Sequence, residues 1–364
     1  MDRPQPIQRA TPLRWLRKNL FSSPLNSILT IVSLLLIYLI AVPVVEWLII
    51  DAYWQGREPS ACPNKSAACW PFIWARFDQF MYGLYPVEQR WRINLGLLIG
   101  LGAAVPVFLP RFRHKAALLA LLLVTYPIIG VVLFTGGYFG LPFVATSKWG
   151  GFFLTIVAAL FVLITSLPLG VLLALGRRSQ MPLLRALCVS WIEFWRSVPA
   201  LVVLFVAIIM FPLFMPADTE IDKLLRALIA LSMLMSSYLA EAMRGALQSI
   251  PRGQYEAAEA LGLNYWQRTC WVVLPQAWPI ALPQITSNFI GLFKETTILL
   301  VIGLFDLLGM VQTAASDPAW LSQGATATGY FFTALFFWVF CFTFSRYGAH
   351  LERKLGAHRT TSGT

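Results

Sequence analysis

Residues 236–277 read SSYLAEAMRGALQSIPRGQYEAAEALGLNYWQRTCWVVLPQA. This stretch mixes charged side chains, glycine and helix-favouring alanine, whereas the chain on either side of it is strongly apolar. Such a composition is unfavourable in a membrane span, because transferring charged side chains into hydrocarbon costs free energy. The stretch is therefore predicted to lie in water between two spans.

The composition of the whole chain indicates an integral membrane protein. Of its 364 residues, 58% are hydrophobic and 12% are charged, whereas soluble domains carry about 25% charged residues. The formal charge of +11 is divided among short segments between apolar runs. That distribution follows the positive-inside rule and lacks the single basic stripe of a nucleic-acid-binding protein, so no nucleic-acid partner is predicted.

The apolar runs predict an all-α fold with about eight transmembrane helices, since about 20 apolar residues cross the hydrocarbon. The basic loops fall at alternate turns, which predicts that the N- and C-termini are both cytoplasmic. The predicted spans are residues 28–50, 93–109, 116–134, 151–175, 198–211, 224–243, 278–308 with an interruption at Lys294 and Glu295, and 325–344.

These spans suggest four regions. Residues 1–26 form a basic cytoplasmic segment, residues 27–149 a three-span extension with a periplasmic loop at 51–92, residues 150–348 a five-span core that includes the loop 249–277, and residues 349–364 a basic cytoplasmic tail. Cys62 and Cys69 lie in the periplasmic loop. They either pair in an oxidising compartment or remain two thiols, and the sequence leaves both possibilities open.

Helix signals divide the stretch 249–277 into two parts. Pro251 suits the first turn of a helix over 252–261, and Gly262 can end that helix with a positive φ. Asn264 is predicted to cap a second helix over 265–274, which Pro275 would terminate. Taken alone, these features also fit an ordinary interhelical loop lying in the headgroups.

A family resemblance gives the loop a role. Glu256, Ala257, Ala258, Gly262, Val272, Leu274 and Pro275 resemble, at their spacing, the EAA loop of permease subunits of ABC importers. Further positions resemble the polar amino-acid subfamily of these permeases. They are Tyr238, Ala240, Glu241, Arg244, Gly245, Gln248, Gly253, Gln254, Gln276, Asn288, Phe289, the run from Lys294 to Thr297 and the run from Phe194 to Pro199. The resemblance covers about residues 150–348, and the additional N-terminal spans resemble the longer M-type subunit of general L-amino-acid importers.

This resemblance implies a type I importer core in the bacterial inner membrane, moving L-amino acids from periplasm to cytoplasm. The chain contains no G-x-x-x-x-G-K-[ST] motif, so ATP and Mg are expected in a partner and the chain itself is predicted to be non-catalytic. The implied partners are a dimer of ATP-binding subunits, a second, homologous permease subunit, a periplasmic amino-acid-binding protein, the L-amino acid and membrane lipid.

In such an importer, the helix over 252–261 would seat in a groove of the ATPase as a coupling helix. Ala257 and Ala258 would permit close approach, while Glu256 or Glu259 would meet a basic partner. The predicted coupling residues are Arg252, Gly253, Glu256, Ala257, Ala258, Glu259, Leu261 and Gly262.

Polar side chains at membrane depth are the candidates for a substrate path. They are Ser236, Ser237, Glu241, Asn288, Lys294, Glu295 and Thr296. Each has a structural alternative: Glu241 as an i, i+3 pair with Arg244, Glu295 neutralised by Lys294, and Asn288 as a helix-packing residue. Leu234 stands where many relatives carry an asparagine, which leaves open whether this subunit forms its own substrate site.

Two other classes of function are possible: a self-sufficient, ion-coupled secondary transporter, and a membrane scaffold that only borrows the loop. No repeat of the 256–275 pattern occurs in the N-terminal half, which disfavours a transporter built from related halves. The three histidines are scattered and Cys188, Cys270 and Cys341 lack C-x-x-C spacing. Neither a metal site nor a cofactor site is therefore predicted.

Overall fold

The structure, a computed structural model, describes residues 12–108, 115–216 and 221–360. Parts of the predicted basic segment and tail, residues 1–11 and 361–364, lie outside this description. Over the described ranges the chain is helical and shows only two isolated β-bridges, so the all-α prediction is confirmed. The α-helices are α1 (Pro12–Asn19), α2 (Pro24–Val45), α3 (Trp70–Tyr82), α4 (Arg90–Phe108), α5 (Lys115–Thr135), α6 (Gly151–Arg177), α7 (Pro182–Ser197), α8 (Ala200–Phe205), α9 (Lys223–Gln248), α10 (Arg252–Ala260), α11 (Tyr265–Gln267), α12 (Leu274–Glu295), α13 (Leu307–Ala315) and α14 (Gln323–Thr360).

Helices occupy all eight predicted span positions. Within the described residues, five helices are each long and apolar enough to cross a bilayer. A bent pair, formed by α7 and the helical segment after it, provides a sixth candidate span. The positions of the second and third spans hold α4 and α5, which flank residues 109–114 outside the described part. The five single spans are Pro24–Ile50, Gly151–Arg177, Lys223–Gln248, Tyr265–Ile302 and Gln323–Lys354.

The predicted boundaries of the fifth span were wrong. The chain runs straight through α7 and then bends by 103° into the helical segment Ala200–Phe214, so residues 198–211 do not form a separate straight span. The bend falls at Val198, whose backbone is extended because Pro199 disfavours a helical residue before it. Glu193 of α7 pairs with Arg177 of α6, at 3.1 Å.

The predicted end of the helix at Pro275 was also wrong. Helical structure continues from Tyr265 to Ile302 as one span. The segment Arg268–Val273 forms a π-helical turn, after which α12 begins at Leu274. Pro275 therefore lies in the first turn of α12, where its missing N–H interrupts no bond of that helix.

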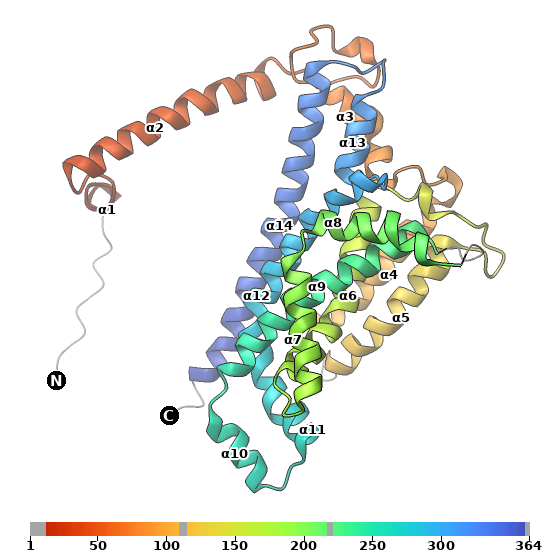
Figure 1. Cartoon of the computed structure of the whole chain (residues 1–364). Coiled ribbons are helices and arrows are strands. Elements are labelled where there is room, and N and C mark those ends of the chain that lie inside the picture. The colour runs from red at the N-terminus through yellow and green to blue at the C-terminus, as the bar shows by residue number, and fades with distance from the viewer. Residues whose placement is uncertain (1–11, 109–114, 217–220, 361–364) are drawn as a thin grey trace. The chain divides into compact units, whose positions relative to one another are not determined.

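The chain forms two compact units, of which the larger comprises Arg76–Asp317 and Gly329–Thr364. Its centre is α9, which packs against α6, α7 and α12, while α4 packs on α5 (Figure 1). Helices α6 and α9 approach closely at Gly170, where an added Cβ would lie 2.8 Å from the Cβ of Leu239. The hydroxyls of Thr165 and Ser232 share a 2.7 Å hydrogen bond across the same pair of helices.

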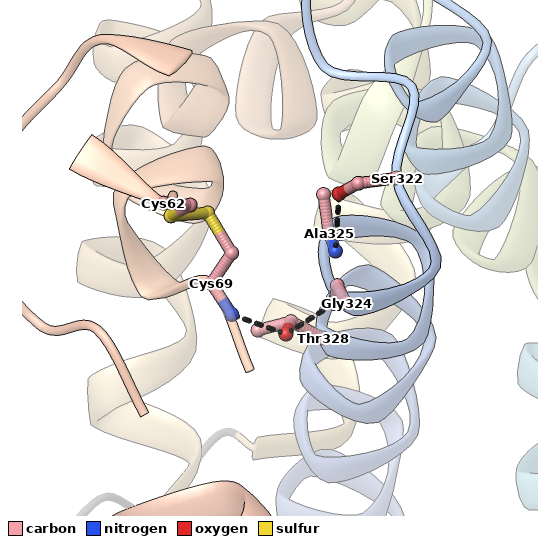
Figure 2. Close-up of a disulfide and its surroundings, with 6 residues drawn as sticks. All are labelled: Cys62, Cys69, Ser322, Gly324, Ala325 and Thr328. Carbon is pink, nitrogen blue, oxygen red and sulfur yellow. Dashed lines mark hydrogen bonds between the residues drawn. A yellow bond between two sulfur atoms is a disulfide. The ribbon is translucent and has the colours of Figure 1, made fainter. Parts of the chain in front are cut away.

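The smaller unit comprises Met1–Ala75 and Pro318–Thr328. Cys62 and Cys69 form a disulfide there, which resolves the alternative that the sequence left open. Figure 2 shows the Cys69 backbone N–H donating to the Thr328 hydroxyl, at 2.8 Å. The following helix, α3, lies in a segment that the sequence suggested only as a polar loop. No long apolar run marked this helix in the sequence, because its sequence WPFIWARFDQFMY includes Arg76 and Asp78.

Asp306 gives the loop before α13 a pH-dependent stability. Its carboxylate is fully buried; Oδ1 accepts from the Gly309 N–H at 2.9 Å, while Oδ2 has no hydrogen-bond partner among the described atoms. Burial raises the pKa of this carboxyl from 3.8 to about 6. The folded state therefore holds one more proton than the unfolded state between these pKa values, and stability falls as the pH rises through this window.

We expect wild-type protein to lose about 2 kcal/mol of stability between pH 4 and pH 6 through this group, because most of the raised pKa of Asp306 is expressed as free energy in that interval. Asp306→Asn keeps an N-cap but has no proton to release. Thermal unfolding in detergent at several pH values should show a smaller decline for Asp306→Asn than for wild type. Parallel pH profiles for the two proteins would contradict the assignment.

Candidate functional site

The predicted coupling helix and its hinge are present. Helix α10 starts after Pro251 and ends at Ala260, one residue before the predicted end. Gly262 follows with a φ of +74°, as predicted. Asn264 then caps α11 in a capping box. The Asn264 side chain accepts from the Gln267 backbone N–H at 2.9 Å, and the Gln267 side chain accepts from the Asn264 backbone N–H at 3.0 Å.

Helix α10 projects from one end of the larger unit (Figure 1) and is fastened through Tyr255. The Tyr255 hydroxyl donates to the Leu247 carbonyl at 3.2 Å and accepts from Arg178 at 2.9 Å. The Arg268 guanidinium lies 5.8 Å from the centre of the Tyr255 ring. Contacts to the end of α6, to α9 and to the π-helical turn, with a 3.0 Å hydrogen bond from Gln276 to Gln254, thus hold one side of α10, while Glu256 and Ala257 are exposed.

The outward side of α10 differs from the sequence interpretation in two respects. Ala258 is 2% exposed and packs inside the chain, so Ala257 is the alanine on the open face. Glu259 forms an ion pair with Arg268 of the same chain, whereas Glu256 is exposed and has no ion pair among the described residues. Arg252 and Gly253 are also exposed, on the first turn.

Apolar side chains are exposed where α10 ends. Leu261 is 80% exposed and Trp266 is 61% exposed, although both lie at the polar end of the bundle. Large apolar side chains grouped on a water-facing surface mark an interaction site. The surface formed by Glu256, Ala257, Leu261 and Trp266 is called the α10 face below.

Glu241, predicted for the substrate path, lies in an arginine cluster. Its carboxylate is 2.8 Å from Arg177, 2.8 Å from Arg244 and 3.8 Å from Arg196, and its side chain is 17% exposed. The alternative of an i, i+3 ion pair with Arg244 is therefore present in the fold, with two further partners. Arg177 comes from α6 and Arg196 from α7, and their separation along the chain gave no signal from which this cluster could be predicted.

The other predicted path residues are divided between α9 and the end of α12. Ser236 and Ser237 are fully buried, and each donates to a carbonyl of its own helix at 2.6 Å. Thr296, 1% exposed, likewise donates to the Phe293 carbonyl. Although α9 and α12 pack together, no hydrogen bond or ion pair connects the two sets of path residues within the described chain.

Three path residues on α12 remain open to further contacts. Asn288 accepts from Gln284 at 3.0 Å, but its own Nδ2 is buried without a partner among the described atoms. Lys294 and Glu295 are both exposed, and neither forms an ion pair within the described residues. The predicted neutralisation of Glu295 by Lys294 is therefore absent from this structure.

An apolar cavity of about 580 Å³ lies among α5, α6 and the start of α9. Its polar lining is confined to a few groups, including Thr146, Asp222 and Lys223, of which Asp222 accepts from Thr146 and caps α9. None of the seven predicted path residues lines this cavity. Its apolar walls suit hydrocarbon better than a zwitterion.

The structure is thus a helical membrane protein with an exposed helix, α10, next to a glycine of positive φ. The chain belongs to the family described as binding-protein-dependent transport system inner membrane component, whose model matches residues 166–357. That match includes α7, α10 and α12, so it covers the features from which the resemblance was drawn.

Known proteins resemble the chain over almost its entire length. It is 48% identical, over 98% of its length and 97% of the relative, to the inner membrane amino-acid ABC transporter permease protein YhdY of Escherichia coli strain K12. It is 36% identical, over 97% of its length and 96% of the relative, to the glutamate/glutamine/aspartate/asparagine transport system permease protein BztC of Rhodobacter capsulatus. A crystal structure of an amino acid ABC transporter with histidines is 27% identical, with a TM-score of 0.48, over 55% of this chain and 90% of the other.

Proposed function

We propose that this chain is the permease subunit of an ATP-driven importer that carries L-amino acids from the periplasm to the cytoplasm across the bacterial inner membrane. The family supports a binding-protein-dependent permease. Two relatives that match it from end to end are named as amino-acid permeases. The substrate is therefore proposed to be an L-amino acid delivered by a periplasmic binding protein.

The α10 face is proposed to seat on a separate ATPase dimer, in which ATP and Mg are bound. The observation that carries this role is an 80% exposed Leu261 at the tip of a helix that is fastened on one side only. Glu256 offers a free carboxylate to a basic groove, and Ala257 permits close approach of the partner backbone. The coupling residues are proposed to be Arg252, Gly253, Glu256, Ala257, Leu261 and Gly262, while Ala258 packs inside the chain and the exposed Glu259 ties α10 to Arg268.

The proposed orientation places the Cys62–Cys69 loop in the periplasm and α10 in the cytoplasm. The disulfide supports this orientation, because structural disulfides persist in oxidising compartments. Five predicted spans separate that loop from α10, so the two lie on opposite sides of the membrane. Both termini are then cytoplasmic.

For the substrate path, Asn288, Lys294, Glu295 and Thr296 are proposed to form the part contributed by α12. Asn288 has an unsatisfied donor and Glu295 an unpaired carboxylate, which suit a carboxylate and an α-ammonium respectively. Glu241, with Ser236 and Ser237, is proposed to support the path from α9. A second, homologous permease subunit would complete it.

Copurification tests the proposal. The tagged chain, expressed with its native partners, is expected to retain an ATPase, whereas Leu261→Asp and Glu256→Arg each release it. Truncating an anchor at the centre of an interface costs about 2 kcal/mol or more of binding free energy. The matched control is Glu352→Arg, which makes the same charge change at an exposed position of α14. Retention of the ATPase by both α10 variants would remove the coupling role.

Reconstitution separates this function from an ion-coupled carrier, which no feature of the described chain favours. Liposomes with the complete complex are expected to accumulate L-amino acids only with internal ATP and external binding protein. Uptake by this chain alone, driven by an ion gradient, would establish the carrier instead.

A further inference from the structure

A second cavity, of about 490 Å³, lies at the end of the bundle from which α10 projects. It is lined by four arginines, one glutamine and one valine, and by no acidic side chain. The lining residues are Arg177, Arg178, Arg185, Arg244, Gln248 and Val189. The cavity thus lies where α6 ends, α7 begins and α9 ends, which is the boundary between hydrocarbon and water.

The positive charge of this cavity exceeds the negative charge around it. Among the described residues, two acids pair with these arginines. Glu193 pairs with Arg177, and Glu241 pairs with both Arg177 and Arg244. Arg178 donates to the neutral groups of Leu247 and Tyr255. Arg185 is exposed, and its guanidinium has no hydrogen bond or ion pair within the described chain. Two glutamates against four arginines leave a local excess of two positive charges.

Apolar side chains are exposed at the start of α7. Met181 is 60% exposed, Leu183 is 73% exposed and Leu187 is 61% exposed. Leu183 and Leu187 lie two residues before and after Arg185, so they are on the other side of α7 from the arginine. An exposed apolar helix side suits hydrocarbon, so the cavity on the other side of α7 lies at the level of the lipid headgroups.

The geometry points to a binding site for the headgroup of an anionic phospholipid, with its phosphate among Arg178, Arg185 and Arg244. Basic pockets between transmembrane helices recognise anionic headgroups by this combination of charge and depth. Arginine forks match phosphate oxygens geometrically. A free phosphate shares the headgroup chemistry but lacks the acyl chains that would hold a lipid at this membrane boundary.

The site has a consequence for α10. Arg178 contacts both the cavity and the Tyr255 hydroxyl, and it also bonds the Leu247 carbonyl at the end of α9. A phosphate that holds Arg178 therefore fixes the side chain that fastens α10 to the bundle. Bound lipid should make the α10 face more rigid, independently of which amino acid is carried.

The test uses the full-length chain in detergent together with the subunits that copurify with it. Short-chain phosphatidylglycerol, short-chain phosphatidylcholine and inorganic phosphate are titrated separately, and bound lipid is counted by native mass spectrometry. Removing one arginine near a membrane surface weakens attraction to anionic lipid by about 1 kcal/mol, or about fivefold. Arg185→Gln is therefore expected to weaken phosphatidylglycerol binding about fivefold, and Arg185→Glu to weaken it further.

Arg353→Gln is the matched control, because Arg353 is exposed on α14 and does not line the cavity. It should bind phosphatidylglycerol as wild type does, and phosphatidylcholine should bind weakly to all variants. Equal phosphatidylglycerol affinity in wild type and Arg185→Glu would overturn the site. Inorganic phosphate binding as tightly as the lipid would overturn the lipid assignment in favour of a soluble anion.

Discussion

Replacing Gly262 with valine is expected to reduce amino-acid uptake and substrate-stimulated ATPase activity about tenfold, while the subunit still assembles in the membrane. Gly262 has a φ of +74°, and an added Cβ there would meet no atom within 4 Å. The penalty is therefore confined to the backbone, at about 1–2 kcal/mol for a β-branched residue in the left-handed region. That strain shifts α10 relative to α11, so the α10 face no longer matches its partner.

Gly262→Asn is the control, because asparagine enters the left-handed region far more easily than valine. It offers a larger side chain at the same open position and should retain most of the coupled activity. Uptake, ATPase activity and membrane assembly are measured for both variants in the reconstituted complex. Equal activity in Gly262→Val and wild type would refute the hinge. Equal loss of activity in both variants would show that any side chain at this position is harmful, whatever backbone conformation it prefers.

Glu241→Gln is expected to be the most destabilising single charge change in the core, at about 3 kcal/mol, with a corresponding loss of transport. The Glu241 side chain is only 17% exposed and binds three arginines, from α6, α7 and α9. Removing the shared carboxylate leaves the three guanidinium groups close together, partly desolvated and without a counter-charge. Leaving buried charges uncompensated in this way is strongly destabilising.

Glu193→Gln provides the matched control for Glu241. Glu193 also pairs with Arg177, but its side chain is 54% exposed, so the same change should cost less than about 1 kcal/mol. Adding Arg244→Gln to Glu241→Gln should recover part of the lost stability, because it removes one of the uncompensated charges. Thermal unfolding in detergent measures all four proteins. If the two glutamate variants unfold alike, the cluster does not hold the three helices together.

Local signals in the sequence were sufficient to predict helix α10 and the backbone that follows it. Pro251, Gly262 and Asn264 act through their own backbone and their near neighbours, so their effects do not depend on the distant fold. The helix start, the positive φ and the cap were all found where those residues predicted them. The spans were predictable for a similar reason, because hydrocarbon thickness fixes how long an apolar run must be.

What the sequence could not show depends on contacts between helices. Pro275 normally signals a stop, yet the π-helical turn before it brings the proline into a first turn without loss. The partner of Glu193, Arg177, lies on another helix, so the ion pair could not be found from local spacing. The arginine cluster around Glu241 and the cavity beside it arise in the same way, since no spacing in one helix reveals which cations will converge from three.

The helical span Tyr265–Ile302 connects the α10 hinge to the α12 part of the proposed substrate path. Its 38 residues extend roughly 55 Å at about 1.5 Å per residue, so a tilt of about 5° would displace its far end by about 5 Å. Asn264 caps the end next to Gly262, and Lys294 and Glu295 lie near the other end. We therefore propose that a small tilt of this span, started at α10, moves the path residues by about the length of an amino-acid side chain.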